Sequence, residues 1–65
     1  MKAKDIKVGM RYRESDEEFT VDSRVKSVEH LVSDKTGAKR GVIIELEDGS
    51  TIQWMDPDKE VREIS

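Results

Sequence analysis

The stretch Ile44–Asp58, IELEDGSTIQWMDPD, decides the fold because it contains a complete hairpin and the single tryptophan of the chain. Apolar and polar residues alternate on both sides of Asp48-Gly49, which is typical of two strands that each bury one face. Asp48-Gly49 itself fits a two-residue hairpin turn. That turn would place Ile44 opposite Gln53 and mix the buried and exposed faces, which argues against it.

A three-residue loop, Glu47–Gly49, keeps the apolar residues on one face. Gly49 would then adopt the left-handed conformation that glycine tolerates best and that forms a bulge beside the turn. The resulting register pairs Leu46 with Ser50, Ile44 with Ile52, and Val42 with Trp54. We therefore predict this loop, and we favour a packed position for Trp54 on the core face over a role as an exposed contact residue.

Three further strands are predicted from the same alternation. The first covers residues 6–13, and the second covers residues 19–32 after a polar loop. A short last strand covers residues 59–64. It follows a turn at Asp56-Pro57-Asp58, because proline cannot donate to a strand ladder. We expect a single 3₁₀ turn just before this last strand.

The apolar residues of the second strand change parity along its length. Val21 and Val25 fall on one parity, whereas Val28 and Val32 fall on the other. Side chains alternate strictly along a strand, so the change requires an inserted residue, and we predict a bulge or sharp bend at Lys26–Ser27. A long strand bent in this way can serve two sheets of a small barrel.

These elements predict an all-β protein: a small five-stranded, strongly bent antiparallel barrel that forms one domain over residues 1–65. A chain of 65 residues is near the lower size limit for folding alone, and it has no cysteine to supply disulfides. The core must therefore hold by itself or with help from self-association. The expected core residues are Ile6, Val8, Met10, Tyr12, Phe19, Val21, Val25, Val28, Val32, Val42, Ile44, Leu46, Ile52, Trp54, Val61 and Ile64.

Two segments carry a resemblance to known proteins: DIKVGMRYR at Asp5–Arg13 and EDGSTIQWMDPDKEVREI at Glu47–Ile64. They resemble the SH3-like small β-barrel proteins of bacteria and bacteriophages, and more loosely the KOW-like first domain of elongation factor P. The resemblance implies an SH3-like barrel. Because small barrels serve many unrelated roles, it does not by itself specify an activity.

Composition and charge limit the classes of protein that fit. Charged residues make up 42% of the chain and the net charge is −3, with a basic beginning and an acidic end. No apolar run is long enough for a signal peptide or a membrane-spanning helix. The absence of cysteine gives no sign of an oxidising compartment. We expect a cytoplasmic protein, or one in the host cytoplasm if a phage encodes it, without membrane association.

No set of residues in the sequence predicts catalysis or metal binding. His30 is the single histidine, and Glu29 beside it points to the opposite face of a strand. The carboxylates of Glu14–Glu18 lack the spacing of a calcium loop, and the glycines do not match a phosphate-binding loop. We interpret His30 as an ordinary polar strand residue, and we expect no enzyme activity, no cofactor, no metal and no small-molecule substrate.

Basic residues suggest a nucleic-acid surface. If those on the outer faces of the first two strands converge with those in or beside the long loop at Ser33–Arg40, they form a cationic stripe that can follow phosphates. The acidic net charge and the lack of interleaved exposed aromatic residues count against this reading, and a plain solvated face is the alternative. The candidate nucleic-acid contacts are Lys7, Arg11, Arg13, Arg24, Lys26, Lys39 and Arg40.

The leading hypothesis is a non-catalytic binding module, an adaptor that contacts a protein partner or a second copy of itself in a small bacterial or phage accessory protein. Ile43 and Met55 fall on the outward parity of adjacent strands, and an exposed apolar pair is typical of a protein contact. A free strand edge would allow sheet extension. Nucleic-acid binding through the basic set is the alternative hypothesis.

Overall fold

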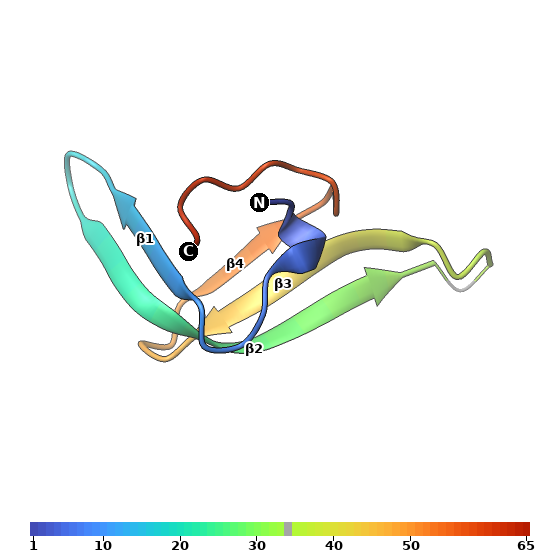
Figure 1. Ribbon diagram of the computed structural model, residues 1–65, viewed down its shortest axis with the longest axis horizontal. Helices are drawn as coiled ribbons and strands as arrows, with labels where there is room; N and C mark the ends of the chain where they lie inside the picture. The colour runs from blue at the N-terminus through green and yellow to red at the C-terminus, as the bar shows by residue number, and fades with distance from the viewer. Residues whose placement is uncertain (34) are drawn as a thin grey trace.

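The protein is described by a computed structural model that covers residues 1–33 and 35–65. These residues form four antiparallel strands in a curled half-barrel (Figure 1). Every strand pairs with its neighbours in the chain, in the order β1-β2-β3-β4. The elements are η1 (a 3₁₀ turn, Ala3–Asp5), β1 (Arg11–Ser15), β2 (Thr20–Val32), β3 (Lys39–Leu46) and β4 (Thr51–Trp54). The all-β prediction is confirmed, with four regular strands in place of the expected five.

The β3–β4 hairpin has the predicted three-residue loop. The amide of Leu46 donates to the carbonyl of Ser50 at 2.8 Å, which closes the ladder on either side of the loop. Gly49 has a φ of 93°, in the left-handed region that favours glycine. The predicted pairs of Ile44 with Ile52 and of Val42 with Trp54 are both present. The requirement that the apolar residues share one face of the hairpin therefore predicted the correct loop.

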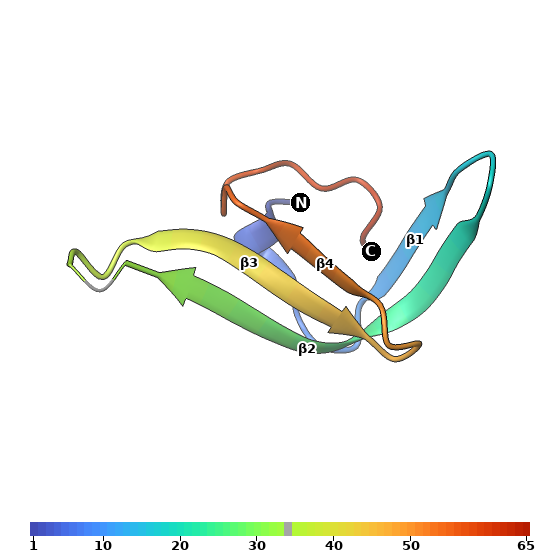
Figure 2. The same ribbon diagram turned by 180° about the vertical axis from the view of Figure 1, so that it is seen from behind.

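β2 is bent by a bulge where the apolar parity changes. Val25 pairs with Leu46 and Ser27 pairs with Glu45, so Lys26 is the inserted residue and the predicted bulge is confirmed. The bend lets β2 pair with β1 through its first half and with β3 through its second half. The curl of the sheet around this point is seen from both sides (Figure 2).

The predicted first strand begins later than expected. A turn at residues 7–9 precedes β1, and Gly9 in this turn has a φ of 94°. Val8 lies in the turn and is 64% exposed, so its predicted place in the core is wrong. A turn of this length preserves the phase of the apolar residues that follow, and Tyr12 therefore still faces inward, where it is buried.

The predicted fifth strand at residues 59–64 is not a regular strand. This segment makes isolated β-bridges, one between Lys2 and Glu60 and one between Tyr12 and Ile64. It enters through a hydrogen-bonded turn, in which the Lys59 amide donates to the Asp56 carbonyl at 3.1 Å. The expected 3₁₀ turn is absent from this place in the described chain and occurs as η1 near the N-terminus.

The C-terminal segment still covers the outer edge of β1. The amide of Arg11 donates to the carbonyl of Ser65 at 2.8 Å, and the amide of Arg13 donates to that of Glu63 at the same distance. The segment also borders the N-terminal residues, where the Ala3 amide donates to the Lys59 carbonyl at 2.9 Å. Both terminal segments therefore lie over the concave side of the sheet (Figure 1).

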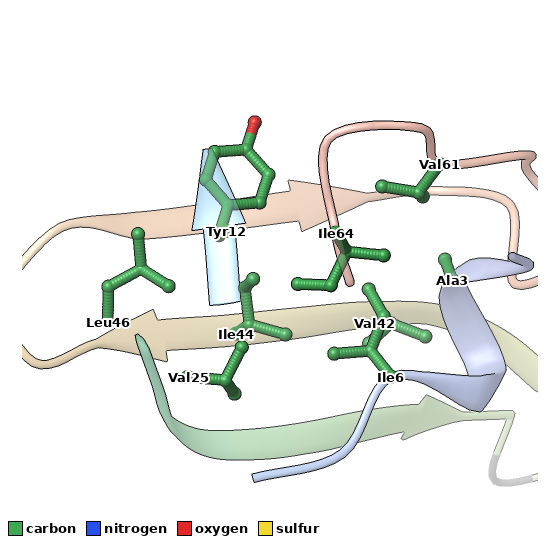
Figure 3. Packing of buried hydrophobic residues seen from close by; sticks show 9 residues of the cluster. All are labelled: Ala3, Ile6, Tyr12, Val25, Val42, Ile44, Leu46, Val61 and Ile64. Atoms are coloured by element: carbon green, nitrogen blue, oxygen red, sulfur yellow. The ribbon is translucent and has the colours of Figure 1, made fainter. Parts of the chain in front are cut away.

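The core fills the space between the concave face and the terminal segments (Figure 3). Burying these side chains removes apolar surface from water, which is the main favourable contribution to folding. Among the described residues the buried apolar side chains are Ala3, Ile6, Tyr12, Val25, Val42, Ile44, Leu46, Val61 and Ile64. Met10, Val21, Val28, Ile52 and Trp54 pack against them and are partly buried.

Two further predicted core residues besides Val8 are wrong, and Trp54 is among those that are only partly buried. Phe19 and Val32 are 56% and 55% exposed, because Phe19 precedes β2 and Val32 is its last residue, so both lie past the part that the terminal segments cover. Trp54 lies on the core side as predicted but remains partly exposed. Its ring meets Tyr12 in a tilted arrangement, with centroids 6.4 Å apart and planes at 57°, a geometry that aromatic pairs prefer.

Candidate functional site

The convex face of β2, β3 and β4 carries an apolar patch that consists of Leu31, Ile43 and Met55. Because Val42 faces the core, the neighbouring positions Gly41 and Ile43 must face outward. Leu31 pairs with Gly41, and Ile43 pairs with Gln53, so the patch spans three strands. Met55 is 70% exposed, whereas Leu31 and Ile43 are half-buried. The structure thus places the predicted pair Ile43 and Met55 on one face, beside a leucine that the sequence analysis missed.

Gly41 lies between members of this convex apolar patch and is itself buried. A Cβ atom on Gly41 would lie 3.6 Å from Leu31 Cδ1 and 3.4 Å from Met55 Cα, so both neighbours border the glycine. The same Cβ would lie 2.6 Å from the carbonyl oxygen of Trp54, far inside ordinary contact. Only glycine therefore fits at this position without a shift of β4.

The exposed end of the patch is held by a side-chain contact. The Nε2 atom of Gln53 donates to the Met55 sulfur at 3.0 Å, and both side chains are exposed. Methionine is flexible and polarizable, and it adapts to varied apolar surfaces. The contact directs this adaptable side chain along the convex face, where a partner can reach it.

An acidic frame runs along the β3–β4 hairpin and the turn that follows it. Residues 41–58 contain five acidic and no basic residues: Glu45, Glu47, Asp48, Asp56 and Asp58. Lys26 Nζ lies 4.0 Å from a Glu45 carboxylate oxygen, and Lys4 Nζ lies 3.1 Å from one of Asp58. In the part of the chain that the structure describes, the other three carboxylates form no ion pair. They leave uncompensated negative charge at both ends of β4.

Two carboxylates of this frame also hold the turns next to β4. The amide of Ser50 donates to Asp48 Oδ1 at 2.8 Å, and the amide of Asp58 donates to Asp56 Oδ1 at 2.9 Å. Such side-chain to backbone bonds are the usual reason for aspartate in turns. The charges at the two ends of β4 are therefore fixed in position.

A hydrogen bond and charge together lower the pKa of Asp58. The bond from Lys4 is the main cause, and the positive charge of Lys4 adds to it. The same contact raises the pKa of Lys4. Both side chains remain ionised at neutral pH, so this pair joins the N-terminal segment to the turn after β4.

Three of the predicted basic residues meet on the outer face of the β1–β2 ribbon. Arg11 pairs with Arg24 across the strands, and Arg13 pairs with Asp22. Arg11 forms a bidentate bond to Asp22, with Nε 2.7 Å and Nη2 2.5 Å from the two carboxylate oxygens. This bond lowers the pKa of Asp22, and the charges of the three arginines act in the same direction. The group therefore keeps a net positive charge.

Of the remaining basic candidates, Lys7 and Lys26 lie near the bulge of β2, whereas Arg40 lies in β3. The turn that contains Lys7 lies against β2, because Arg24 Nη1 donates to the Gly9 carbonyl at 2.9 Å. Lys26 is at the bulge and faces Glu45. Arg40 is the second residue of β3, and this strand starts at the opposite end of the molecule from the β1–β2 tip (Figure 1). The single continuous stripe therefore does not include Arg40, and the side chain of Lys39 lies outside the described residues.

The described residues show no arrangement that binds a metal ion or encloses a ligand. Over residues 1–33 and 35–65 there is no cluster of three metal-ligating side chains and no pocket. His30 is exposed and lies opposite Val42. No helix in the described chain has the length and apolar character needed to cross a bilayer. The candidate sites are therefore open surfaces.

Tyr12 is a core residue whose pKa is strongly perturbed. Burial raises the pKa of the Tyr12 hydroxyl well above its ordinary value, and a hydrogen bond donated to Glu14 raises it further. Tyr12 packs against Trp54 and bridges to Ile64, so its environment follows from its structural position. A perturbed pKa at this residue gives no indication of catalysis.

Comparisons with protein-family models, with curated proteins and with solved structures gave no match to this chain. The geometry of the surfaces is therefore the basis for any functional assignment.

Proposed function

We propose that the protein is a non-catalytic binding module that contacts a protein partner through the convex apolar patch. The observation that carries the proposal is that Leu31 of β2 and Met55, the residue after β4, both border Gly41 on the outer face, where Met55 is 70% exposed. Exposed contiguous apolar surface on a small protein is typical of an interaction site, and methionine is common at such sites. The acidic frame adds selectivity, because it attracts partners with basic residues.

We also infer an SH3-like barrel in which the C-terminal segment takes the place of a fifth strand. The inference is supported by the paired hydrogen bonds between Arg11 and Ser65, in which each amide donates to the carbonyl of the other residue at 2.8 and 2.9 Å. The bend of β2 also supports the inference, because it lets this one strand pair with β1 and with β3. A small accessory protein of bacterial or phage origin, acting in the cytoplasm, is the setting that this proposal favours.

A pair of variants tests the protein-binding proposal. Met55→Ser removes an apolar side chain that is 70% exposed in the patch, and Val8→Ser removes one that is 64% exposed in the turn before β1. Each should change stability by less than about 0.5 kcal/mol, because both positions lie on the surface. Immobilised wild type and the Val8→Ser variant should retain the same protein from native lysate after nuclease treatment, and the Met55→Ser variant should lose it. Equal retention by all three would contradict the proposal.

Nucleic-acid binding is the second candidate function, and the grouping of Arg11, Arg13 and Arg24 on one outer face favours it. Binding through three guanidinium groups would weaken as salt rises, with a slope of about −0.9 for each phosphate neutralised. Arg13→Gln should then reduce the slope by about 1 in a fluorescence titration against duplex and single-stranded oligonucleotides. The absence of binding to either form at low salt would rule it out.

A further inference from the structure

The outer edge of β4 has free hydrogen-bonding groups. Leu46 and Ser50 are hydrogen-bonded partners, so residues two and four positions further along β4 also direct their backbone groups to β3. Thr51 and Gln53 consequently direct their amides and carbonyls away from the sheet, and Met55, the residue after β4, directs its amide the same way. Among the residues that the structure describes, none of these three has a backbone partner outside the strand ladder. β4 is therefore an open edge strand.

The other edges of the sheet differ from this one. The C-terminal segment hydrogen-bonds to Arg11 and Arg13 and so covers β1. The second half of β2 is also open, because the backbone groups of Val28 and His30 point away from β3 and have no partner in the described chain. Lys26 at its start and the exposed Glu29 between Val28 and His30 give this β2 edge a mixed charge, in contrast to the two acidic ends of β4. An exposed edge is a template for another strand, so the charges beside it decide which strand it accepts.

The charges beside β4 favour a basic partner. Glu47 and Asp48 lie before β4 and Asp56 lies after it, and none of them forms an ion pair with the described residues. A strand laid along β4 would pass both acidic ends. Opposite charges placed across neighbouring strands stabilise a sheet, whereas like charges destabilise it.

The same charges argue against a second copy of the chain as the occupant. Antiparallel pairing of β4 with itself around Gln53 would place Asp48 opposite Asp58 and Ser50 opposite Asp56 of the other copy. Asp48 would then face another carboxylate, and Asp56 would face an uncharged serine. Self-pairing along this edge is therefore disfavoured.

The faces on either side of the edge define the side chains of the partner. On the concave side Ile52 and Trp54 are partly buried at the rim of the core. On the convex side Met55 extends the apolar patch. An added strand would contact both faces through alternate side chains, which is how sheet extension combines affinity with sequence preference.

We propose that β4 accepts an extended segment of a partner protein as an additional strand, and that this segment is apolar at its centre with lysine or arginine at its ends. The inference rests on the protein-binding role proposed above and names the partner of that surface. The main-chain bonds come from Thr51, Gln53 and Met55. The basic ends pair with the acidic frame at the two ends of β4.

Proline at position 53 provides a selective test. The Gln53 amide faces away from β3, so Gln53→Pro removes the edge donor without removing a bond of the β3–β4 ladder. The preceding residue, Ile52, is already extended, as the residue before a proline should be. Gln53→Ala is the matched control, because it removes the same side chain and keeps the amide. Thr51→Pro is a second variant of the same kind, and Trp54 fluorescence confirms that each variant is folded.

The probe is a displayed library of random linear peptides, selected on the wild-type protein. Selected peptides should have alternating β-branched or aromatic residues between basic ends. Their affinity for Gln53→Pro should fall by at least about tenfold relative to Gln53→Ala, which loses the same contact to Met55 but keeps the amide, because the proline ring occupies the place of the incoming carbonyl. Hydrogen exchange should show protection of the Thr51, Gln53 and Met55 amides on binding.

The outcomes separate this inference from the proposed function. Peptides that bind Gln53→Pro as well as the wild type but lose affinity for Met55→Ser would overturn the added strand and leave the convex patch as the binding site. Peptides that bind Gln53→Pro and Met55→Ser as tightly as the wild type would overturn both the added strand and the convex patch as a binding site. Selection of no peptide would also overturn both. Selection of acidic peptides would overturn the basic partner. Protection of the Val28 and His30 amides from hydrogen exchange, in place of the β4 amides, would overturn the choice of edge.

Discussion

Replacing Gly41 with alanine tests the close approach of β3 and β4 beneath the convex apolar patch. The added Cβ would lie 2.6 Å from the Trp54 carbonyl oxygen, whereas ordinary contact begins near 3.4 Å. The backbone of β4 would have to retreat by the difference, about 0.8 Å, and backbone yields less easily than a flexible side chain. The change would weaken the pairing of Val42 with Trp54, the last pair of this ladder.

The expected magnitude is the balance of two effects. Overpacking of a well-packed site costs roughly 1–3 kcal/mol. Gly41 does not have a positive φ, so alanine adopts its conformation without strain and gains about 0.4–1 kcal/mol by restricting the unfolded chain. A net loss of about 1 kcal/mol remains. In a domain of this size it lowers Tm by about 4–8 °C.

Thermal unfolding followed by Trp54 fluorescence measures both the stability and the local displacement. Gly49→Ala is the control, because its Cβ would meet no atom within 4 Å while its φ of 93° makes any side chain strained. That variant should lose stability through the loop and leave the tryptophan emission of the folded protein unchanged. An unchanged or higher Tm for Gly41→Ala, with unchanged emission, would refute the close approach.

Three other measurements examine the core and the ionisable groups. Ile44→Ala should lower the free energy of unfolding by about 2–5 kcal/mol in urea titration, since Ile44 is completely buried, and a loss below about 1 kcal/mol would contradict the assigned core. Glu14→Ala should lower the pKa of Tyr12 while leaving it above the ordinary 10.0, because burial persists; phenolate absorbance of this single tyrosine reports it, and an unchanged pKa would exclude the contact. The pKa of Asp58 is lowered by its bond from Lys4, so its contribution to stability is complete above about pH 3.8 and is lost as the pH falls through the lower folded-state value. Asp58→Asn should remove this part of the acid dependence of unfolding, and an identical pH profile would contradict the pair.

The hairpin and the bulge could be predicted because each follows from a counting rule. The register around Gly49 was determined by requiring that the apolar residues of two strands share one face. The bulge at Lys26 was determined by the change of parity between Val25 and Val28. Both rules use only the spacing of residues that are close in the chain, and both predictions are confirmed.

Errors arose where two conformations have the same spacing. The turn at residues 7–9 keeps the phase of an extended strand, so the exposed Val8 could not be distinguished from a core residue. Phe19 and Val32 have the correct parity but lie beyond the covered part of β2. How far the terminal segments reach over a sheet depends on long-range packing, which a local pattern does not contain. The contribution of Ala3 to the core was missed for the same reason.

For the candidate surface residues, the sequence predicted which face of the sheet each side chain lies on, but it did not predict where along the molecule each residue lies. Outward parity correctly placed Ile43 and Met55 on the convex face, and counting onward from the bulge could also have indicated Leu31. Parity says nothing about which end of a strand a residue occupies. Arg40 was therefore grouped with Arg13, although Arg13 belongs to β1 and Arg40 to the start of β3, and these segments lie toward opposite ends of the sheet (Figure 1).

The bridge between Tyr12 and Ile64 also has a kinetic consequence. These residues are joined across almost the whole chain, whereas the β3–β4 hairpin closes a loop of three residues. The entropy of closing a long loop must be overcome before such a distant contact can form, so distant pairing is slow. We expect the hairpin to order first and the seam along β1 to form last. During synthesis the nascent chain would therefore keep the ring of Tyr12 uncovered until residues 61–65 leave the ribosome.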